Sequence, residues 1–280
     1  MRAMFRRSAQ ADPFDAPDRP SARDEVLAAL GPWVEAHRRT AWRPVVVPGS
    51  EPAGPRSKFC GQAWLRPDEA SPACNSCGRP LQLLVQLDLD GLPGELDRRY
   101  GEGMLQLFAC VDEGCPAEGA WEAFSDVASL VRVVPGAGLV VAGRSRAGFP
   151  PVAITGWERF ADAPDPDDHE LAGLAASYDF ALRTVTLRCA EVGLQATLAL
   201  DDLGVEDIAH ASVGDKLAGW PSWAQFRDYP SCPTCGRTMH LVFQLDAEDH
   251  VPFAPGDAGI GHITQCPTHP TTVAFAWSSG

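Results

Sequence analysis

The sequence predicts an α+β protein that is rich in β-strands, built from two copies of one β unit in a pseudo-twofold relation, with an N-terminal helix. Three observations predict this class. The 280 residues include 25 prolines and 26 glycines, which favours short strands and turns over long helices. A stretch of 31 residues occurs twice at a constant offset. The clearest helical pattern lies near the N-terminus, and the later apolar segments have the length of strands.

The composition limits the classes of function. Apolar residues make up 45% of the chain, which supports a packed core, but no apolar run reaches the roughly 18 residues that a membrane span requires. We therefore expect no membrane association. The formal net charge of −14 repels phosphate backbones and predicts no binding to nucleic acid. The same charge attracts a basic protein partner, or does no more than keep the chain soluble.

The first twenty residues carry basic side chains without an apolar stretch behind them. We expect a disordered tail there and no secretory signal. Without an export signal the chain is expected in the cytoplasm, which is reducing. Nine cysteines in such a compartment suggest metal ligation rather than disulfides. The oligomeric state stays open.

The N-terminal element is a predicted helix followed by a strand. Ser21 and Asp24 have the spacing of a capping box, and an apolar face that includes Trp33 follows at helical spacing. Pro32 should weaken or kink this helix. A strand over residues 41–47 comes next. Further strands are expected near 81–89, 104–109, 129–134, 152–160 and 272–277, with a hairpin over 180–200.

The repeated stretch runs from Lys58 to Asp88 and again from Lys216 to Asp246 without a gap, and 11 of the 31 positions are identical. Each copy contains a Cys-x2-Cys-Gly pattern and a Gln-x-Asp triplet. Chance rarely keeps so many positions in register, so we interpret the stretch as an internal duplication. The expected divisions of a single globular unit are 1–20 for the tail, 21–52 for the helix and strand, 53–148 for the first repeat, 149–212 for a connecting segment and 213–280 for the second repeat.

Each copy offers a second pair of metal ligands after its Cys-x2-Cys pair. The first set is Cys74, Cys77, Cys110 and Cys115, and the second set is Cys232, Cys235, Cys266 and His269. Both are tetrahedral zinc sets without an open position, and each forms a zinc knuckle that joins two strands. The sequence therefore predicts two structural Zn²⁺ ions per chain. A thioredoxin-like redox pair is the alternative, but such a pair begins a helix, whereas these patterns lead into strands. If His269 does not reach the metal, the second site has an open position.

A second group of polar residues lies around the repeated strand, where Gln and Asp alternate on one face. The residues considered for partner binding are Lys58, Gln86, Asp88, Lys216, Trp220, Gln244 and Asp246. The alternative is that the Gln-x-Asp groups hydrogen bond to loop backbone, and this alternative is favoured. Cys60 and Cys189 remain outside both metal sets, and a free cysteine is usually a small buried hydrophobic residue.

Several of these segments resemble the bacterial YwqG-like family, a domain of unknown function. The resemblance covers roughly residues 22–280 and is carried by segments 57–61, 77–81 and 86–88, then 214–221, 244–246 and 256–259. Cys60 and Ala218 depart from the family pattern, which usually has a second glycine there. The family is similar to programmed-cell-death-2-like proteins, which escort a newly made ribosomal protein. The resemblance implies a mixed α+β fold dominated by β-sheet, and a role in binding another polypeptide.

Two functions follow from these features. The first is a non-enzymatic, zinc-stabilised module, of the chaperone, adaptor or immunity type, that binds a protein partner. The second is a zinc-dependent hydrolase that uses an incompletely ligated metal in the second repeat, with Asp246, His240 or His262 as acid–base groups. The sequence lacks Gly-x-Ser-x-Gly, His-Glu-x-x-His and phosphate-loop patterns, which favours the first function.

Overall fold

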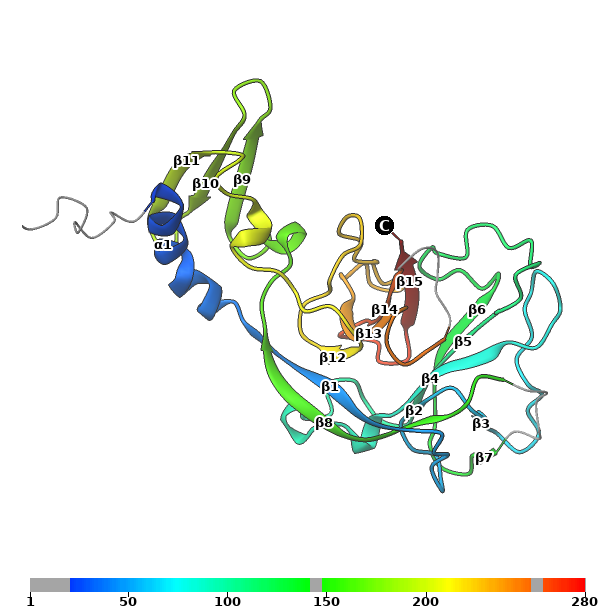
Figure 1. The fold of residues 1–280 in the computed structure, drawn as a ribbon. Coiled ribbons are helices and arrows are strands. Elements are labelled where there is room, and N and C mark those ends of the chain that lie inside the picture. The colour runs from blue at the N-terminus through cyan, green and yellow to red at the C-terminus, as the bar shows by residue number, and fades with distance from the viewer. Residues whose placement is uncertain (1–20, 142–147, 253–258, 280) are drawn as a thin grey trace, which may run out of the picture.

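The computed structural model describes residues 21–141, 148–252 and 259–279. The tail expected over residues 1–20 lies outside this part of the chain. The described residues form one α-helix, one large antiparallel sheet and two small sheets (Figure 1). The prediction of a β-rich chain with a helix near the N-terminus is therefore confirmed.

Helix α1 (Ala22–Ala36) begins at the capping box that the sequence predicts. The Asp24 amide donates to Ser21 Oγ over 3.2 Å, and the Ser21 amide donates to Asp24 Oδ2 over 3.2 Å. These bonds satisfy amides at the start of the helix that have no intrahelical acceptor. Pro32 lies inside the helix, and Trp33 is almost fully buried one residue later.

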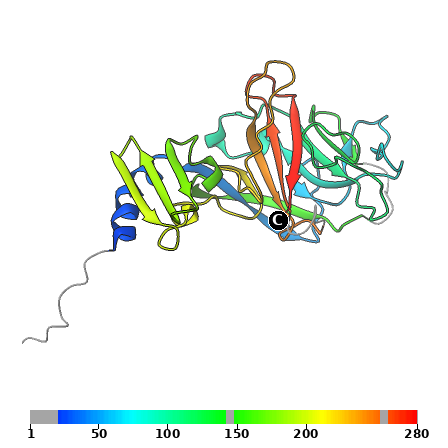
Figure 2. The same ribbon diagram turned by 90° about the horizontal axis from the view of Figure 1, so that it is seen from above.

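A three-stranded antiparallel sheet packs beside α1 and encloses a core of its own. It consists of β9 (Leu174–Asp179), β10 (Thr184–Cys189) and β11 (Leu194–Ala199), in the order β11-β10-β9. The predicted hairpin over 180–200 is confirmed in β10 and β11, whereas β9 was not predicted. The Trp33 indole donates to the carbonyl of Ala172 over 2.7 Å and ties α1 to the turn before β9. Figure 2 shows the helix and the small sheet at one end of the molecule.

The large sheet contains ten strands in the order β15-β14-β13-β12-β1-β8-β2-β4-β5-β6. Their bounds are β1 (Arg39–Pro48), β2 (Lys58–Phe59), β4 (Gln82–Asp88), β5 (Met104–Ala109), β6 (Ser129–Val134), β8 (Val152–Asp162), β12 (Lys216–Ala218), β13 (His240–Asp246), β14 (Ile260–Gln265) and β15 (Val273–Ser278). Strands β3 (Trp64–Leu65) and β7 (Val140–Val141) form a separate pair. Short 3-10 helices cover Leu89–Gly91, Gly94–Leu96, Pro166–Asp168 and Val205–Asp207.

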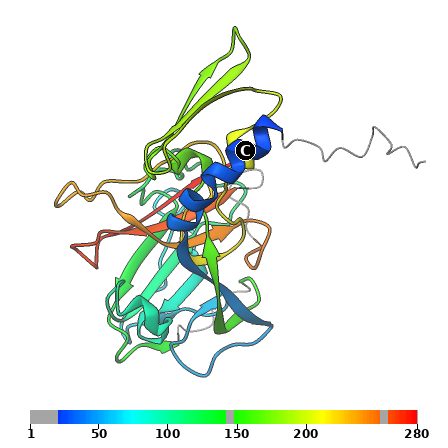
Figure 3. The ribbon, with the colours of Figure 1, turned by 90° about the vertical axis from the view of Figure 1, so that its left-hand side faces the viewer.

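The large sheet curls until its two edge strands, β15 and β6, approach each other, so it is nearly closed. The long antiparallel pair β1 and β8 lies at its centre, with four strands on either side. The main hydrophobic core fills the inside of this curl and includes Phe59, Leu107 and Phe243, all of which are completely buried. Figure 3 looks from the α1 side and shows the large sheet behind the helix and the small sheet.

The two repeated segments have the same pairing register. Lys58 pairs with Gln86 between β2 and β4, and Lys216 pairs with Gln244 between β12 and β13. In β4 the ladder shifts between residues 83 and 85, and in β13 it shifts between 241 and 243, which is the same place at an offset of 158. Residues that correspond at the sequence offset of 158 therefore also have equivalent pairing partners in the sheet.

The residues that follow β2 and end β12 also share an unusual backbone conformation. Cys60 has a φ of 55° and Ala218 a φ of 59°, and each precedes a glycine with positive φ. The left-handed region favours glycine, because a Cβ crowds the following carbonyl there. Cys60 and Ala218 therefore both adopt a backbone conformation that glycine adopts most readily.

Candidate metal centres

The first metal centre lies where the loop before β4 meets the loop after β5. It consists of Cys74, Cys77, Cys110 and Cys115, whose sulfur atoms all lie within 4.8 Å of one another. Sγ of Cys74 lies 3.7 Å from Sγ of Cys115, and Sγ of Cys77 lies 3.7 Å from Sγ of Cys110. The structure therefore brings together all four ligands that the sequence assigns to the first repeat.

The second metal centre occupies the corresponding loops before β13 and after β14. It consists of Cys232, Cys235, Cys266 and His269, whose ligand atoms also lie within 4.8 Å of one another. Nδ1 of His269 lies 3.6 Å from Sγ of Cys232 and 3.6 Å from Sγ of Cys266. The imidazole thus supplies a fourth donor, and the open position on which the hydrolase alternative depends receives no support from this geometry.

These separations match the edges of a tetrahedral zinc site. A Zn²⁺ ion with Zn–S bonds of about 2.3 Å and a Zn–N bond of about 2.05 Å places two sulfurs about 3.8 Å apart and a sulfur about 3.6 Å from a nitrogen. The observed distances of 3.6 to 3.7 Å between ligand atoms agree with both values. All nine cysteines are free. The two clusters can therefore each hold a metal ion.

The local backbone explains why each Cys-x2-Cys-Gly pattern turns back on itself. In the first centre the Gly78 amide donates to the Cys74 carbonyl over 2.8 Å, and in the second the Gly236 amide donates to the Cys232 carbonyl over 2.8 Å. The two glycines have φ values of 72° and 70°, which an L-residue rarely adopts. This turn directs both cysteine side chains of each pattern toward one point.

Backbone amides lower the pKa of the first cysteine in each centre, whereas burial raises the pKa of Cys110. Burial raises the pKa of Cys74, but the amides of Cys77 and Ser76 outweigh this effect and lower the pKa to about 7. In the second centre burial is again outweighed, chiefly by the amides of Thr234 and Cys235, and the pKa of Cys232 falls to about 6. Amide dipoles that stabilise a thiolate favour the form that ligates a metal.

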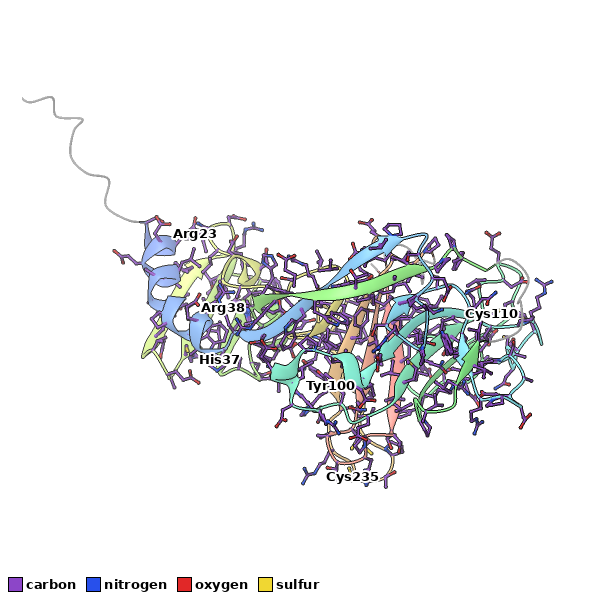
Figure 4. The ribbon with its side chains drawn as sticks, turned by 90° about the horizontal axis from the view of Figure 1, so that it is seen from below. Arg23, His37, Arg38, Tyr100, Cys110 and Cys235 are labelled. Atoms are coloured by element: carbon purple, nitrogen blue, oxygen red, sulfur yellow. The ribbon has the colours of Figure 1, made fainter. Side chains whose placement is uncertain are left out.

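The two centres differ in exposure. The first is packed against a small apolar cluster that includes Leu83 and Phe108, and its ligands are buried or half-buried. In the second, Cys232 and Cys266 are buried, whereas Cys235 is exposed. Figure 4 shows Cys110 and Cys235 on separate parts of the molecule, with Cys235 on a protruding loop.

The residues considered for partner binding lie mostly inside the protein. Lys58, Gln86, Lys216 and Gln244 are completely buried, and Trp220 is 4% exposed. Gln86 Nε2 donates to the Arg56 carbonyl over 3.0 Å, and Gln244 Nε2 donates to the Gly214 carbonyl over 2.9 Å. The two glutamines thus hydrogen bond to loop backbone, which is the alternative favoured from the sequence.

The aspartates of the Gln-x-Asp triplets are half-buried and also hold loops. Asp88 Oδ2 accepts from Arg56 over 3.1 Å, and Asp246 Oδ2 accepts from the Gly214 amide over 2.9 Å. The indole of Trp220 donates to the carbonyl of His37 over 2.9 Å. Partner binding by this group of residues stays a prediction.

The acid–base groups considered for a hydrolase are not part of either metal cluster. His262 is buried, its Nε2 lies 3.0 Å from the Ser222 carbonyl, and burial lowers its pKa to about 3. His240 lies on the surface beside Arg99, with His240 Nδ1 3.3 Å from Arg99 Nη2. Neither histidine is among the ligand atoms of the second cluster.

The unassigned cysteines are buried thiols, as expected. Burial raises the pKa of Cys60 to about 12, so this thiol stays protonated. Cys189 is fully buried in the core beneath α1.

Two groups of interacting polar residues were not predicted. Lys216 Nζ donates to Asp162 Oδ2 over 2.8 Å, and both side chains are fully buried. Its counterpart Lys58 pairs with Glu51, whose side chain is 38% exposed. The occurrence of a lysine at the same position of both repeats was the signal in the sequence that could have pointed to these ion pairs. It could not have identified Asp162 as a partner, because Asp162 lies far from both repeats in the sequence. A further cluster of Asp215, Asp249 and His250 joins the 214–216 loop to the loop after β13.

In the part of the chain that the structure describes, no helix combines the length and apolar character that crossing a membrane requires.

Comparison with known proteins gives a family but no activity. The chain matches the domain of unknown function DUF1963 over residues 57–265, a span that contains the whole first centre and ends one residue before Cys266. It is also similar to the uncharacterized protein YpfL of Salmonella typhimurium, with 53% identity over 34 residues. That similarity covers 12% of this chain and 8% of YpfL, so the chain spans only a small part of this relative. Because the DUF1963 match extends over most of its length, this protein belongs to the DUF1963 family.

Proposed function

We propose that this chain is a non-enzymatic protein-binding module of the cytoplasm, of the chaperone, adaptor or immunity type, whose fold is stabilised by two Zn²⁺ ions. The observation that carries the proposal is the pair of four-donor clusters, each complete without a water or a substrate. A metal that four side chains ligate fully serves the fold, whereas a catalytic zinc keeps one position for the reacting molecule. The one imidazole among the donors, His269, would itself ligate the ion and so would not be free to act as a general base.

Zinc fits both clusters better than other common metals. The donors are seven thiols and one imidazole, and no carboxylate is a member of either set. Soft sulfur donors in a tetrahedral arrangement favour zinc over magnesium or calcium, which take oxygen ligands. Each ion would join the loop before one long strand to the loop after its neighbour.

A single duplicated zinc-binding unit accounts for the shared features of the two halves. The matching register of β2–β4 and β12–β13, the shared shift in the ladder, and the left-handed residues at 60 and 218 all occur at one offset. Two β units that flank the β1–β8 pair would also explain the pseudo-twofold arrangement.

A basic polypeptide is the partner that the charge of the chain favours. The net charge of −14 produces an attractive potential for cationic segments and raises their rate of encounter. The resemblance to polypeptide-binding escort proteins supports the same class of partner, and the family match is compatible with it without naming an activity.

Metal analysis tests the zinc part of the proposal. Mass spectrometry of the purified protein should find about two Zn²⁺ per chain, by the ligand count. Cys74→Ser and Cys232→Ser should each reduce the content to about one. Cys60→Ala is the matched control, because it removes a thiol outside both clusters and introduces the residue type that the other half carries at Ala218, where φ is 59° against 55° at Cys60. Retention of both ions in the two serine variants would contradict the assignment of ligands.

Affinity capture from the native host tests the protein-binding part. The full chain should retain a polypeptide that is released by high salt, because electrostatic attraction between exposed charges is screened. Failure to recover any polypeptide under several salt and growth conditions would count against this function.

A further inference from the structure

An aromatic groove of about 450 Å³ lies at the seam where the large sheet nearly closes. Its walls come from both halves of the chain: the loop at 121–123 on one side, and the loop at 223–228 with the end of β15 on the other. The amide of Trp277 in β15 donates to the carbonyl of Trp121 over 3.2 Å, which ties the two walls together.

Four large aromatic side chains line this groove. They are Trp121, Trp223, Phe226 and Trp277. Trp121 is 50% exposed and Phe226 is 69% exposed, which is uncommon for such large apolar groups. The rings of Trp121 and Trp277 meet edge to face, with centroids 6.4 Å apart. Clustered exposed aromatic residues of this kind mark interaction sites, because tryptophan contributes strongly to binding.

The ring of Trp223 is held in place by a buried carboxylate behind it. Its Nε1 donates to Asp168 Oδ2 over 2.9 Å, and Asp168 Oδ2 also accepts from Tyr229 over 3.0 Å. Burial raises the pKa of Asp168 above its usual value. One wall of the groove is therefore preorganised, which reduces the entropy lost when a ligand binds.

The charges of the groove select a cation. Glu122 and Asp228 line it, both are exposed, and neither forms an ion pair with any residue in the described ranges. No lysine or arginine is among the lining residues. His262 also lines the groove, but burial lowers its pKa to about 3, so it adds no positive charge near neutral pH. Aromatic faces beside carboxylates attract cations and repel anions.

We propose that this groove binds an arginine side chain of an extended, basic polypeptide segment. A planar guanidinium stacks on indole rings and donates hydrogen bonds from its edge to two carboxylates, which an ammonium does less well. The proposal rests on the proposed protein-binding function and names the surface and the partner chemistry for it. It places the partner at the seam between the halves, where Ala123 of the groove also packs against the apolar cluster that includes Cys232 and Cys266 of the second centre.

An oriented peptide library tests the groove even while the natural partner is unidentified. The immobilised full-length protein is offered nonapeptide pools in which one central position is fixed as arginine, lysine, citrulline or glutamate and the other positions vary. Arginine peptides should be retained at least tenfold over citrulline peptides, which have the same shape without the charge, and lysine peptides should rank between them. Glutamate peptides should not bind.

Variants locate the binding. Trp121→Ala and the double variant Glu122→Gln/Asp228→Asn should each lower arginine-peptide retention about tenfold or more. Phe180→Ala, which removes an aromatic side chain that is 78% exposed on the small sheet, and Asp202→Asn, which removes an exposed charge there, should leave retention unchanged. Unchanged retention in Trp121→Ala, or equal retention of citrulline peptides, would overturn the proposal. So would a dimer of the wild-type chain that Trp121→Ala converts to a monomer, because a second copy would then occupy the groove.

The outcomes separate this inference from the proposed function. If the host polypeptide still binds to Trp121→Ala, the protein-binding function stands and the groove is not its surface. If arginine peptides bind at the groove but the host yields no polypeptide, the cation site stands and the protein-binding function fails.

Discussion

The buried lysine of each half shows how one residue type can have different energetic importance in two related positions. Lys216 and Asp162 form a fully buried pair, and Asp162 also accepts hydrogen bonds from the amides of Ser212 and Trp220. Lys58 is equally buried, but its partner Glu51 reaches solvent. Water can therefore stabilise the carboxylate that remains when Lys58 is removed, whereas it cannot reach Asp162.

We expect Lys216→Met to lower the free energy of unfolding by about 3–5 kcal/mol, because the substitution leaves a buried, uncompensated carboxylate. Lys58→Met is the matched control in the other half and should cost clearly less. Urea denaturation followed by circular dichroism measures both values. Equal losses in the two variants would show that exposure of the acidic partner does not set the cost.

A second residue-scale prediction concerns acid stability. The folded-state pKa of His262 is about 3, whereas the ordinary value is 6.5. Between these values the unfolded chain binds a proton that the folded chain does not, so this residue contributes stability that is lost as the pH falls through 6.5 toward 3. In the middle of this window the free energy of unfolding falls by about 1.4 kcal/mol for each pH unit by which the pH is lowered.

The check on His262 is a comparison of urea unfolding at several pH values between 6.5 and 4.5. The free energy of unfolding of His262→Gln should depend less on pH than that of the wild type, because unfolding of the variant takes up about one proton fewer. Any loss of metal at acidic pH affects both proteins alike and cancels in the difference. Parallel pH profiles of the two proteins would contradict the prediction.

At the scale of elements, the loops that carry the two candidate metal centres share a turn but differ in how far their cysteines are protected from solvent. The first centre is covered by apolar side chains and has four thiol ligands. The second has one imidazole ligand and an exposed thiol at Cys235. A ligand that solvent reaches is open to chelators and oxidants, so the two centres should not release their metals together.

We expect zinc release in hydrogen peroxide or in a colorimetric chelator to occur in two phases of about equal amplitude, with the second centre first. The fast phase should be absent from Cys235→Ser and present in Cys77→Ser, because only the former removes the exposed ligand. A stopped-flow absorbance record of the released zinc measures both phases. Loss of the slow phase in Cys235→Ser would reverse the assignment.

At the scale of the whole molecule, the metals should maintain the closure of the large sheet. Each centre links the loop before one strand to the loop beyond its neighbour, next to the edges β6 and β15 that nearly meet. Site formation and folding are coupled for such ions, since the unfolded chain does not hold the ligands together.

Removal of both ions by a strong chelator should therefore abolish the cooperative thermal transition of the large sheet. The small sheet with α1 has a separate core and should lose less of its structure. Differential scanning calorimetry, with tryptophan fluorescence and hydrogen exchange to separate the two regions, measures the effect. An unchanged melting temperature after verified metal removal would show that the clusters do not stabilise the fold.

Local patterns in the sequence predicted most of the strands and the two ligand sets. Strand β4 was expected over 81–89 and occupies Gln82–Asp88, because an apolar run between turn residues is a local signal. The spacing of Ser21 and Asp24 likewise predicted the hydrogen-bonded cap of α1. Strand β9 was missed because its side chains are largely exposed, so its sequence shows little apolar alternation.

The sequence by itself determined the chemistry of the clusters, the type of most elements and the repeat offset, because ligand spacing, periodicity and identity are properties of neighbouring residues. Only the tertiary structure decided which polar groups are buried and which aromatic side chains are left exposed. Lys216 meets Asp162 across a separation of 54 residues, and Trp121 meets Trp277 from the other half of the chain. The first contact arises because β12 and β8 both flank β1 in the sheet, and the second arises where the two edges of the sheet come together. No local pattern in the sequence encodes the order of the strands or the meeting of the edges.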